Sequence, residues 1–406
     1  MTTSAPSTPD SPATGFSPSA FAAGLLAALV GYASSVALVV QGIAGAGANR
    51  EQITSGLVAI GIALGLSAIL LSWRSRLPIS IAWTTPGVAL LATTGPIEGG
   101  FPAAVGAFIV TGLLIMLAGF WTPLGRWVAA IPKPLASAML AGILLKLCLA
   151  PFVAVTKVPE TALLVLATWV VVGRFARLYA VPAAVLVALG AMMLDAPGQA
   201  LPADLWPRLT FVAPVFTLET VIGLSVPLFI VTMASQNIPG LTVLASYGFH
   251  PRVGPPFLVT GAASSIAALF GSPAVNFAAI TAAICAGPDA DPNPARRWQA
   301  AAMCGVGHLL LTGLAAVTAT VVTQSPPILI EAVAGLALIG AFGSAMLGAV
   351  QSEEYRTPAV MTLLVTASGL SLFGIGSAFW GLLLGGGMYL LHRPRPSPQP
   401  AAEAAE

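Results

Sequence analysis

Two short apolar segments, 78–94 and 272–287, hold the polar side chains with which this chain could bind a ligand. Each begins near a proline, and each is shorter and more polar than the roughly 20 apolar residues that cross a membrane as one helix. The rings of Trp83 and Phe277 offer flat apolar faces, which suit a ring-shaped ligand. The candidate hydrogen-bonding residues of the two segments are Ser80, Trp83, Thr84, Thr85, Ser272 and Asn276.

An extended start that leads into a half-length helix is the local structure that both segments favour. Pro86 and the turn from Pro273 to Asn276 are natural helix starts, because the first turn of a helix does not use the N–H that proline lacks. The free N–H groups of two half-helices would then face each other near the middle of the membrane. Such groups, together with the positive ends of the helix dipoles, favour an anion and especially a carboxylate.

Further polar residues lie at matching places on two long apolar stretches. Tyr32 lies within 18–42, and Gln236 and Asn237 lie at the end of 217–236. Polar groups inside such stretches face a cavity or another helix rather than lipid. We therefore add these three residues to the candidate binding site, with helix-to-helix hydrogen bonding as the structural alternative.

Three ionisable residues interrupt the apolar stretches and are candidates for carrying a proton: Glu331, His308 and Glu219. A carboxyl group removed from water favours its neutral form, so it can take up and release a proton near neutral pH. The alternative for each is a hydrogen bond that only holds helices together.

Composition identifies the solvent of this chain as lipid. Of its 406 residues, 57% are hydrophobic and 7% are charged, whereas soluble domains carry about 25% charged residues. The basic residues are scattered, which argues against a nucleic-acid partner. There is no phosphate-binding glycine loop, no paired-acid magnesium motif and no Cys/His cluster. We therefore expect no enzyme activity, no catalytic residues, no metal site and no cofactor.

Counting the two short segments gives fourteen crossings. With the N-terminus in the cytoplasm, twelve of the sixteen Lys and Arg residues fall on the cytoplasmic side, as the positive-inside rule requires. Both termini are then cytoplasmic. The twelve longer spans are expected at 18–42, 51–72, 99–119, 134–156, 159–173, 178–195, 217–236, 255–270, 296–322, 327–350, 358–374 and 375–391.

Weak internal matches indicate a repeat. Pro134 matches Pro327 at an offset of 193, Pro78 matches Pro273 at 195, and Gly24 matches Gly223 at 199. Two halves of seven spans must have opposite topology because seven is odd, and substrate sites of such transporters lie where the halves meet. The predicted fold is an all-α polytopic membrane protein with a 7+7 inverted repeat and two broken half-helix segments.

Three strings give the chain a specific resemblance: AWTTPG from Ala82, SQNIPG from Ser235 and NFAAITAAIC from Asn276. With their flanking spans, they resemble the bacterial benzoate/proton symporter family (BenE type) over about residues 18 to 391. The resemblance implies the fold of nucleobase and sulfate permeases, with a core domain that moves vertically against a gate domain, and a homodimer joined through the gates.

By this resemblance the core domain is 18–122 with 217–322, and the gate domain is 123–196 with 323–391. The tails 1–17 and 392–406 are expected to be disordered. We hypothesise a secondary active transporter that imports benzoate or a related aromatic carboxylate with protons across a bacterial inner membrane. The alternatives are a permease for another anion or a nucleobase-like substrate, and a passive anion channel.

Overall fold

The computed structural model describes residues 15–95, 97–121, 123, 131–195, 206–278, 280–324, 326–372 and 375–392. The predicted tails therefore fall outside the described residues except for 15–17 and His392. Among residues 15–17, Ser17 caps the first helix, and its hydroxyl donates a hydrogen bond to the buried carboxylate of Asp291 at 2.5 Å.

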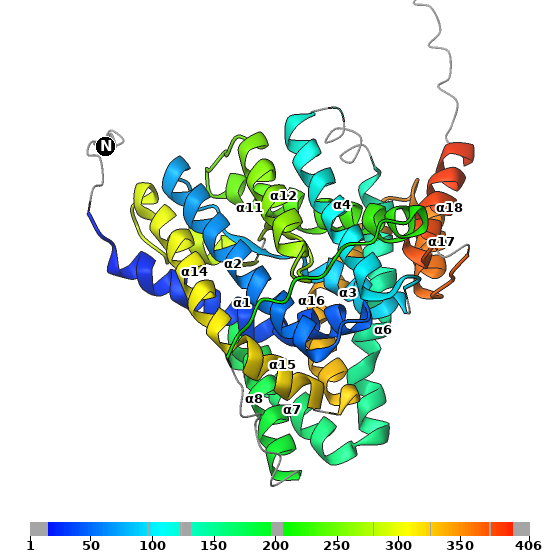
Figure 1. The fold of residues 1–406 in the computed structure, drawn as a ribbon, viewed down its shortest axis with the longest axis horizontal. Helices are drawn as coiled ribbons and strands as arrows, with labels where there is room; N and C mark the ends of the chain where they lie inside the picture. Colours follow the sequence, from blue (N-terminus) through cyan, green and yellow to red (C-terminus); the bar gives the residue numbers. More distant parts are fainter. Residues whose placement is uncertain are drawn as a thin grey trace, which may run out of the picture.

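The described residues of the first half of the chain are mostly helical and include one short strand (Figure 1). Its elements are α1 (Pro18–Gly45), α2 (Arg50–Ser75), β1 (Ile81–Trp83), α3 (Thr85–Thr94), α4 (Gly100–Phe120), α6 (Lys133–Lys157), α7 (Pro159–Phe175), the 3₁₀ turn η1 (Arg177–Tyr179) and α8 (Ala180–Asp195).

The second half repeats this order with more interruptions. Its elements are α9 (Leu218–Thr220), η2 (Val221–Ser225), α10 (Val226–Thr232), η3 (Met233–Asn237), α11 (Ile238–Ser246), α12 (Gly254–Ala268), β2 (Val275–Phe277), α13 (Ile280–Ala286), η4 (Pro294–Arg296), α14 (Trp298–Leu311), η5 (Thr312–Leu314), α15 (Ala315–Gln324), α16 (Pro327–Val350), α17 (Arg356–Ala367) and α18 (Ser377–His392).

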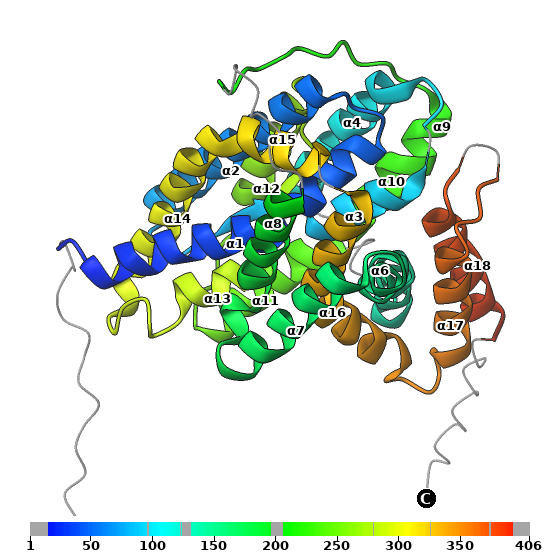
Figure 2. The same ribbon diagram turned by 90° about the horizontal axis from the view of Figure 1, so that it is seen from below.

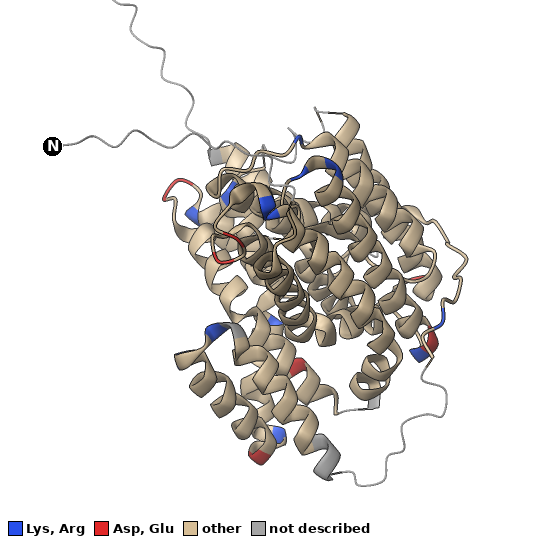
Figure 3. Cartoon of the chain, turned by 90° about the vertical axis from the view of Figure 1, so that its left-hand side faces the viewer, with Lys and Arg blue, Asp and Glu red and all other residues tan. Residues whose placement is uncertain are grey.

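Seven helices in the described part of the chain are long and apolar enough to cross a membrane. They are Pro18–Gly45, Arg50–Ser75, Gly100–Phe120, Lys133–Lys157, Leu218–Ser246, Pro294–Thr323 and Pro327–Val350. Charged residues are few, and most of the helical surface carries none (Figure 3). The helical membrane fold is thus confirmed, although the number of fourteen crossings is not.

Matching elements of the two halves support the inverted repeat. Strand β1 begins at Ile81 and β2 at Val275, an offset of 194 residues. Pro132 and Pro326, again 194 apart, cap α6 and α16 with nearly equal dihedral angles, φ −55° and ψ 124° against φ −54° and ψ 122°. Helix α2 packs against α14 and α12 packs against α4, which are the two pairs that the repeat exchanges.

Three expected boundaries were wrong. The second half-helix begins at Ile280 rather than between Pro273 and Asn276, because residues 275–277 form a strand instead. The span expected at 358–374 is helical only to Ala367, and Gly369 then turns the chain with φ +68°. The span expected at 217–236 continues to Ser246.

The π-helical segments η2 and η3 carry that longer span past its expected end. A π-helical turn inserts one extra residue without ending the helix. The helix therefore continues past Pro227 and Pro239, which lie just after the two π-helical segments. Such turns occur frequently at functional sites.

The elements of the predicted core and gate pack mainly among themselves. In the gate half, α16 lies along α6, α17 and α18 cover another side of α6, and α7 pairs with α8 (Figure 2). In the core half, α1 contacts α8 and α16 of this group, and α3 contacts α6. The division into core and gate itself remains a prediction.

Glycines allow the core helices α2 and α14 to approach closely. A Cβ atom built on Gly305 would lie 2.7 Å from the carbonyl oxygen of Gly65 and 2.9 Å from Ile69 Cγ1. Since van der Waals packing rather than the hydrophobic effect holds helices together in lipid, small residues at this contact contribute directly to stability.

We expect Gly305→Leu to destabilise the fold by about 1–3 kcal/mol, the usual cost of overpacking a tight contact. The measurement is thermal unfolding of the purified protein in detergent. Gly340→Leu on α16 is the matched control, because a Cβ there meets nothing within 4 Å. Equal melting temperatures for the two variants would contradict this account of the α2–α14 contact.

Candidate functional site

The two broken segments meet as a short antiparallel ribbon in the interior of the protein. Ile81 pairs with Phe277, Ala82 with Asn276 and Trp83 with Val275. The pairing continues at both ends, since Thr84 N–H donates to the Ala274 carbonyl at 3.1 Å and Ala278 N–H donates to the Ser80 carbonyl at 3.0 Å. The prediction that the segments are interrupted and adjacent is therefore confirmed.

Helix α3 starts directly after β1, with Pro86 in its first turn as expected. The Thr84 hydroxyl accepts a hydrogen bond from Gly87 N–H at 3.2 Å, and Val88 N–H donates to the Thr84 carbonyl at 2.8 Å. Pro86 has no N–H. Within the described residues this leaves Thr85 N–H, at the positive end of the helix, without a partner.

Three aromatic rings from three elements meet beside this helix start. The Trp83 ring lies edge-on to Tyr32 of α1 at 5.9 Å and to His308 of α14 at 6.1 Å between centroids. Its indole N–H donates to Ser35 Oγ at 2.9 Å. The Tyr32 hydroxyl is 3.0 Å from Thr318 Oγ1. These contacts fix the plane of the Trp83 ring.

The hydrogen bonds of His308 decide which of its ring nitrogens can exchange a proton. Nδ1 lies 2.9 Å from the carbonyl oxygen of Cys304. A carbonyl oxygen only accepts, so Nδ1 carries the hydrogen in this contact. Nε2 points toward α1, where a Cβ on Gly31 would lie 3.9 Å away. In the neutral ring, Nε2 is therefore the nitrogen that can accept a proton, on the side of the ring that faces α1.

Two buried polar residues of the broken segments hold the ribbon in place. Ser80 Oγ and Thr281 Oγ1 are 2.7 Å apart and join the start of β1 to α13. The Asn276 amide, oriented so that its hydrogen bonds are satisfied, donates to the carbonyls of Ala82 at 3.0 Å and Phe277 at 3.1 Å. Both Ser80 and Asn276 are fully buried.

The π-helical segment η3 positions Asn237 against β2. Its side-chain oxygen accepts a hydrogen bond from the backbone N–H of Phe277 at 3.0 Å, and the side chain is fully buried. One turn earlier, Thr232 Oγ1 lies 2.8 Å from Thr84 Oγ1. The span from Leu218 to Ser246 thus holds both strands of the ribbon.

The predicted binding residues fall into two groups by exposure. Tyr32, Thr85 and Gln236 are half-buried and retain accessible surface, whereas the others are buried within the ribbon and its supports. Among the buried ones, the Ser272 hydroxyl donates to the Pro273 carbonyl at 2.9 Å, and the ring of Phe277 lies edge-on to Phe257 at 6.0 Å.

The two acidic candidates for proton transfer, Glu331 and Glu219, lie on α16 and α9 rather than on the ribbon. Glu331 is half-buried on α16, a helix of the predicted gate that contacts α1. Glu219 is exposed in the first turn of α9, where a carboxylate interacts favourably with the helix dipole.

Several supporting residues escaped the sequence analysis, namely Thr232, Thr281, Cys304 and Thr318. Thr281 lies in the NFAAITAAIC string, so its position beside the broken segment was a usable signal. The other three lie inside long apolar spans, where a single threonine or cysteine ordinarily bonds to its own helix.

The structure is a helical membrane fold built from two inverted repeats, each with a short strand that leads into a half-helix. In overall fold the chain is similar to the transmembrane domain of a cyanobacterial bicarbonate transporter, BicA, with a TM-score of 0.57 and 15% identity over 93% of this chain and 98% of that one.

The family model described as benzoate membrane transport protein matches residues 14–391. The chain is 40% identical to the inner membrane protein YdcO of Escherichia coli over 92% of this chain and 96% of that protein. It is 31% identical to the benzoate membrane transport protein of Acinetobacter baylyi over 93% and 96% of the two chains. The chain therefore belongs to the benzoate membrane transport protein family.

We expect Asn237→Ala to lower stability by about 1–3 kcal/mol, because it leaves the buried N–H of Phe277 without an acceptor. Thermal unfolding in detergent measures the loss. Thr242→Ala, on the exposed side of the adjoining helix α11, should change the melting temperature little, since its hydroxyl only bonds to the Ile238 carbonyl of its own helix. A similar loss in both variants would contradict the bridging role of Asn237.

Proposed function

We propose that this protein imports benzoate or a related aromatic carboxylate together with protons across a bacterial inner membrane. The observation that carries the proposal is the position of the Trp83 ring beside the start of α3. Trp83 is followed directly by Thr84, which caps α3, and then by Thr85, whose backbone N–H has no partner among the described residues. An aromatic ring and a carboxylate are the two groups that these features would recognise.

The chemistry of the site needs no fixed positive charge. Tyr32, Thr85 and Gln236 can donate hydrogen bonds to a carboxylate, and the dipole of α3 favours its negative charge. The name of the Acinetobacter baylyi relative, a benzoate membrane transport protein, supports the same substrate class.

Proton coupling follows from energetics. An anion entering a cell whose interior is negative works against about 2.3 kcal/mol per charge at 100 mV. Import with at least one proton removes this cost. We propose Glu331, His308 and Glu219 as candidates for carrying it.

We further propose that the core moves vertically against the gate in a homodimer joined through the gates, with both termini in the cytoplasm. The ribbon, Tyr32, Trp83 and His308 all lie in the proposed core, so a bound substrate would move with them. The similarity in fold to a bicarbonate transporter keeps another anion as the alternative substrate.

Reconstituted protein should accumulate labelled benzoate when an inward proton gradient is applied. An uncoupler should abolish this accumulation, because the gradient supplies the driving force. Neutral benzoic acid crosses lipid unaided, so protein-free liposomes define the background. Accumulation that is insensitive to the uncoupler would reject proton coupling, and competition by bicarbonate, sulfate or uracil but not by substituted benzoates would reject the substrate class.

We expect Glu331→Gln to reduce proton-driven uptake at least about tenfold while exchange between two benzoate pools remains within about twofold of the unmodified protein. Exchange needs no net proton movement, whereas net uptake does. Glu160→Gln, an exposed acid in the first turn of α7, is the matched control on the proposed gate. Equal loss of uptake and exchange would assign Glu331 a structural role.

A further inference from the structure

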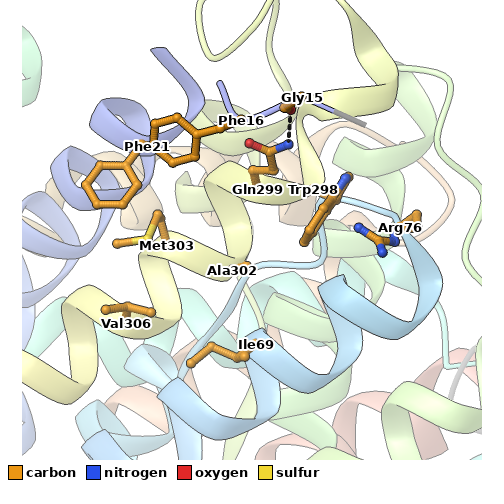
Figure 4. Close-up of a pocket in the computed structure, with 10 residues that line it drawn as sticks. All are labelled: Gly15, Phe16, Phe21, Ile69, Arg76, Trp298, Gln299, Ala302, Met303 and Val306. Atoms are coloured by element: carbon orange, nitrogen blue, oxygen red, sulfur yellow. Dashed lines mark hydrogen bonds between the residues drawn. The ribbon is translucent and has the colours of Figure 1, made fainter. Parts of the chain in front are cut away.

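A groove lies on the outside of the core, away from the broken segments. It is formed by the start of α1, the end of α2 and the first turns of α14, and it has a volume of about 400 Å³ (Figure 4). This volume lies in the range of roughly 300–1,000 Å³ that is typical of small-molecule sites. The transport chemistry proposed above does not use it.

The walls of the groove are apolar and run along the helix axes. Phe21, Ile69, Met303 and Val306 line it. From Trp298 at one end to Val306 at the other is eight residues of helix, or about 12 Å. That length exceeds a single aromatic acid and fits an extended hydrocarbon chain.

The groove opens onto a surface that lipid would cover. Leu66, Leu70 and Trp73 on α2 are 56%, 45% and 60% exposed. Their spacing of four and three residues places them on one face of the helix, next to Ile69. A stripe of large apolar side chains at these exposures is expected where a membrane helix meets acyl chains.

One end of the groove is polar and positively charged. The guanidinium of Arg76 lies 4.2 Å from the centre of the Trp298 ring. Arg296 does not itself line the groove, but its guanidinium lies beside Gly15, which does, since a Cβ on Gly15 would be 3.3 Å from Nη2. Neither arginine has a carboxylate within salt-bridge distance in the described ranges, and Arg296 Nε is buried without a hydrogen-bond partner there.

The nearby acid and amide are already engaged. The Asp291 carboxylate accepts hydrogen bonds from Ser17 Oγ and Asn293 N–H. Gln299 accepts from Ser17 N–H and donates to the Gly15 carbonyl, both at 2.9 Å. These donors are neutral, so Asp291 keeps its charge, but among the described residues it makes no ion pair with Arg76 or Arg296.

We propose that this groove is a binding site for an anionic phospholipid. Its phosphate would contact Arg76 and Arg296, and one acyl chain would lie along Met303 and Val306 toward Ile69. Arginine pairs with phosphate in a planar two-bond geometry, and basic pockets between membrane helices on the cytoplasmic side suit anionic headgroups. The bound lipid would fasten the first turn of α1 to α2 and α14.

The test is native mass spectrometry of the full-length, delipidated protein titrated with phosphatidylglycerol or phosphatidylcholine. We expect one phosphatidylglycerol to bind at least about tenfold more tightly than phosphatidylcholine. Both lipids carry the phosphate, but the choline ammonium of phosphatidylcholine would be repelled by the two guanidinium groups. Arg76→Gln should remove this preference. Arg74→Gln should keep it, because Arg74 is an exposed arginine on the last turn of α2 that does not line the groove.

A second variant tests the acyl chain separately. Val306→Phe narrows the groove and should weaken the binding of both lipids by a similar factor, while Arg76→Gln should weaken phosphatidylglycerol more than phosphatidylcholine. Equal binding of the two lipids by the unmodified protein, or an unchanged preference in Arg76→Gln, would overturn the proposal.

Competition with two small anions tests whether the groove binds something other than a lipid. Inorganic phosphate and benzoate are each titrated against the phosphatidylglycerol complex. Displacement by phosphate alone would assign the site to a free anion, and displacement by benzoate would assign it to the transported substrate. Either result would also overturn the lipid proposal without bearing on proton-driven uptake.

Discussion

The need to satisfy every backbone polar group inside lipid governs this structure. A helix satisfies its own N–H and C=O groups, so a break in a helix exposes groups that water cannot reach. Here two breaks satisfy each other, because residues 81–83 pair with residues 275–277. The broken segments of the two halves are therefore stable together in a way that neither would be alone, and their meeting point fixes where the halves join.

The side chains around the ribbon extend the same principle. Asn237 accepts the N–H of Phe277, and the Ser80–Thr281 and Thr84–Thr232 hydroxyl pairs join the ribbon to α13 and to the end of α10. A fully satisfied buried network is rigid. Beside this network, Thr85 is half-buried and its N–H has no partner among the described residues, next to the buried Trp83 ring. The proposed ligand would therefore meet a rigid site without a fixed charge.

Local signals predicted part of this arrangement and missed the rest for physical reasons. Pro86 correctly marked the start of α3, because the first turn of a helix tolerates proline. Pro273 did not start α13, since pairing with β1 keeps residues 275–277 extended. The contact of Trp83 with Tyr32 and His308 depends on how three distant segments pack, which no local pattern encodes.

The proposed division of the site between core and gate would constrain how a proton is coupled to substrate. Tyr32, Trp83 and His308 belong to one packed group, while Glu331 lies on α16 against α1. Under the proposed vertical movement, the distance between His308 and the substrate stays constant, and the distance from either to Glu331 changes. A proton on His308 Nε2 would therefore travel with the substrate, whereas Glu331 could exchange protons with the moving core in only one of its positions.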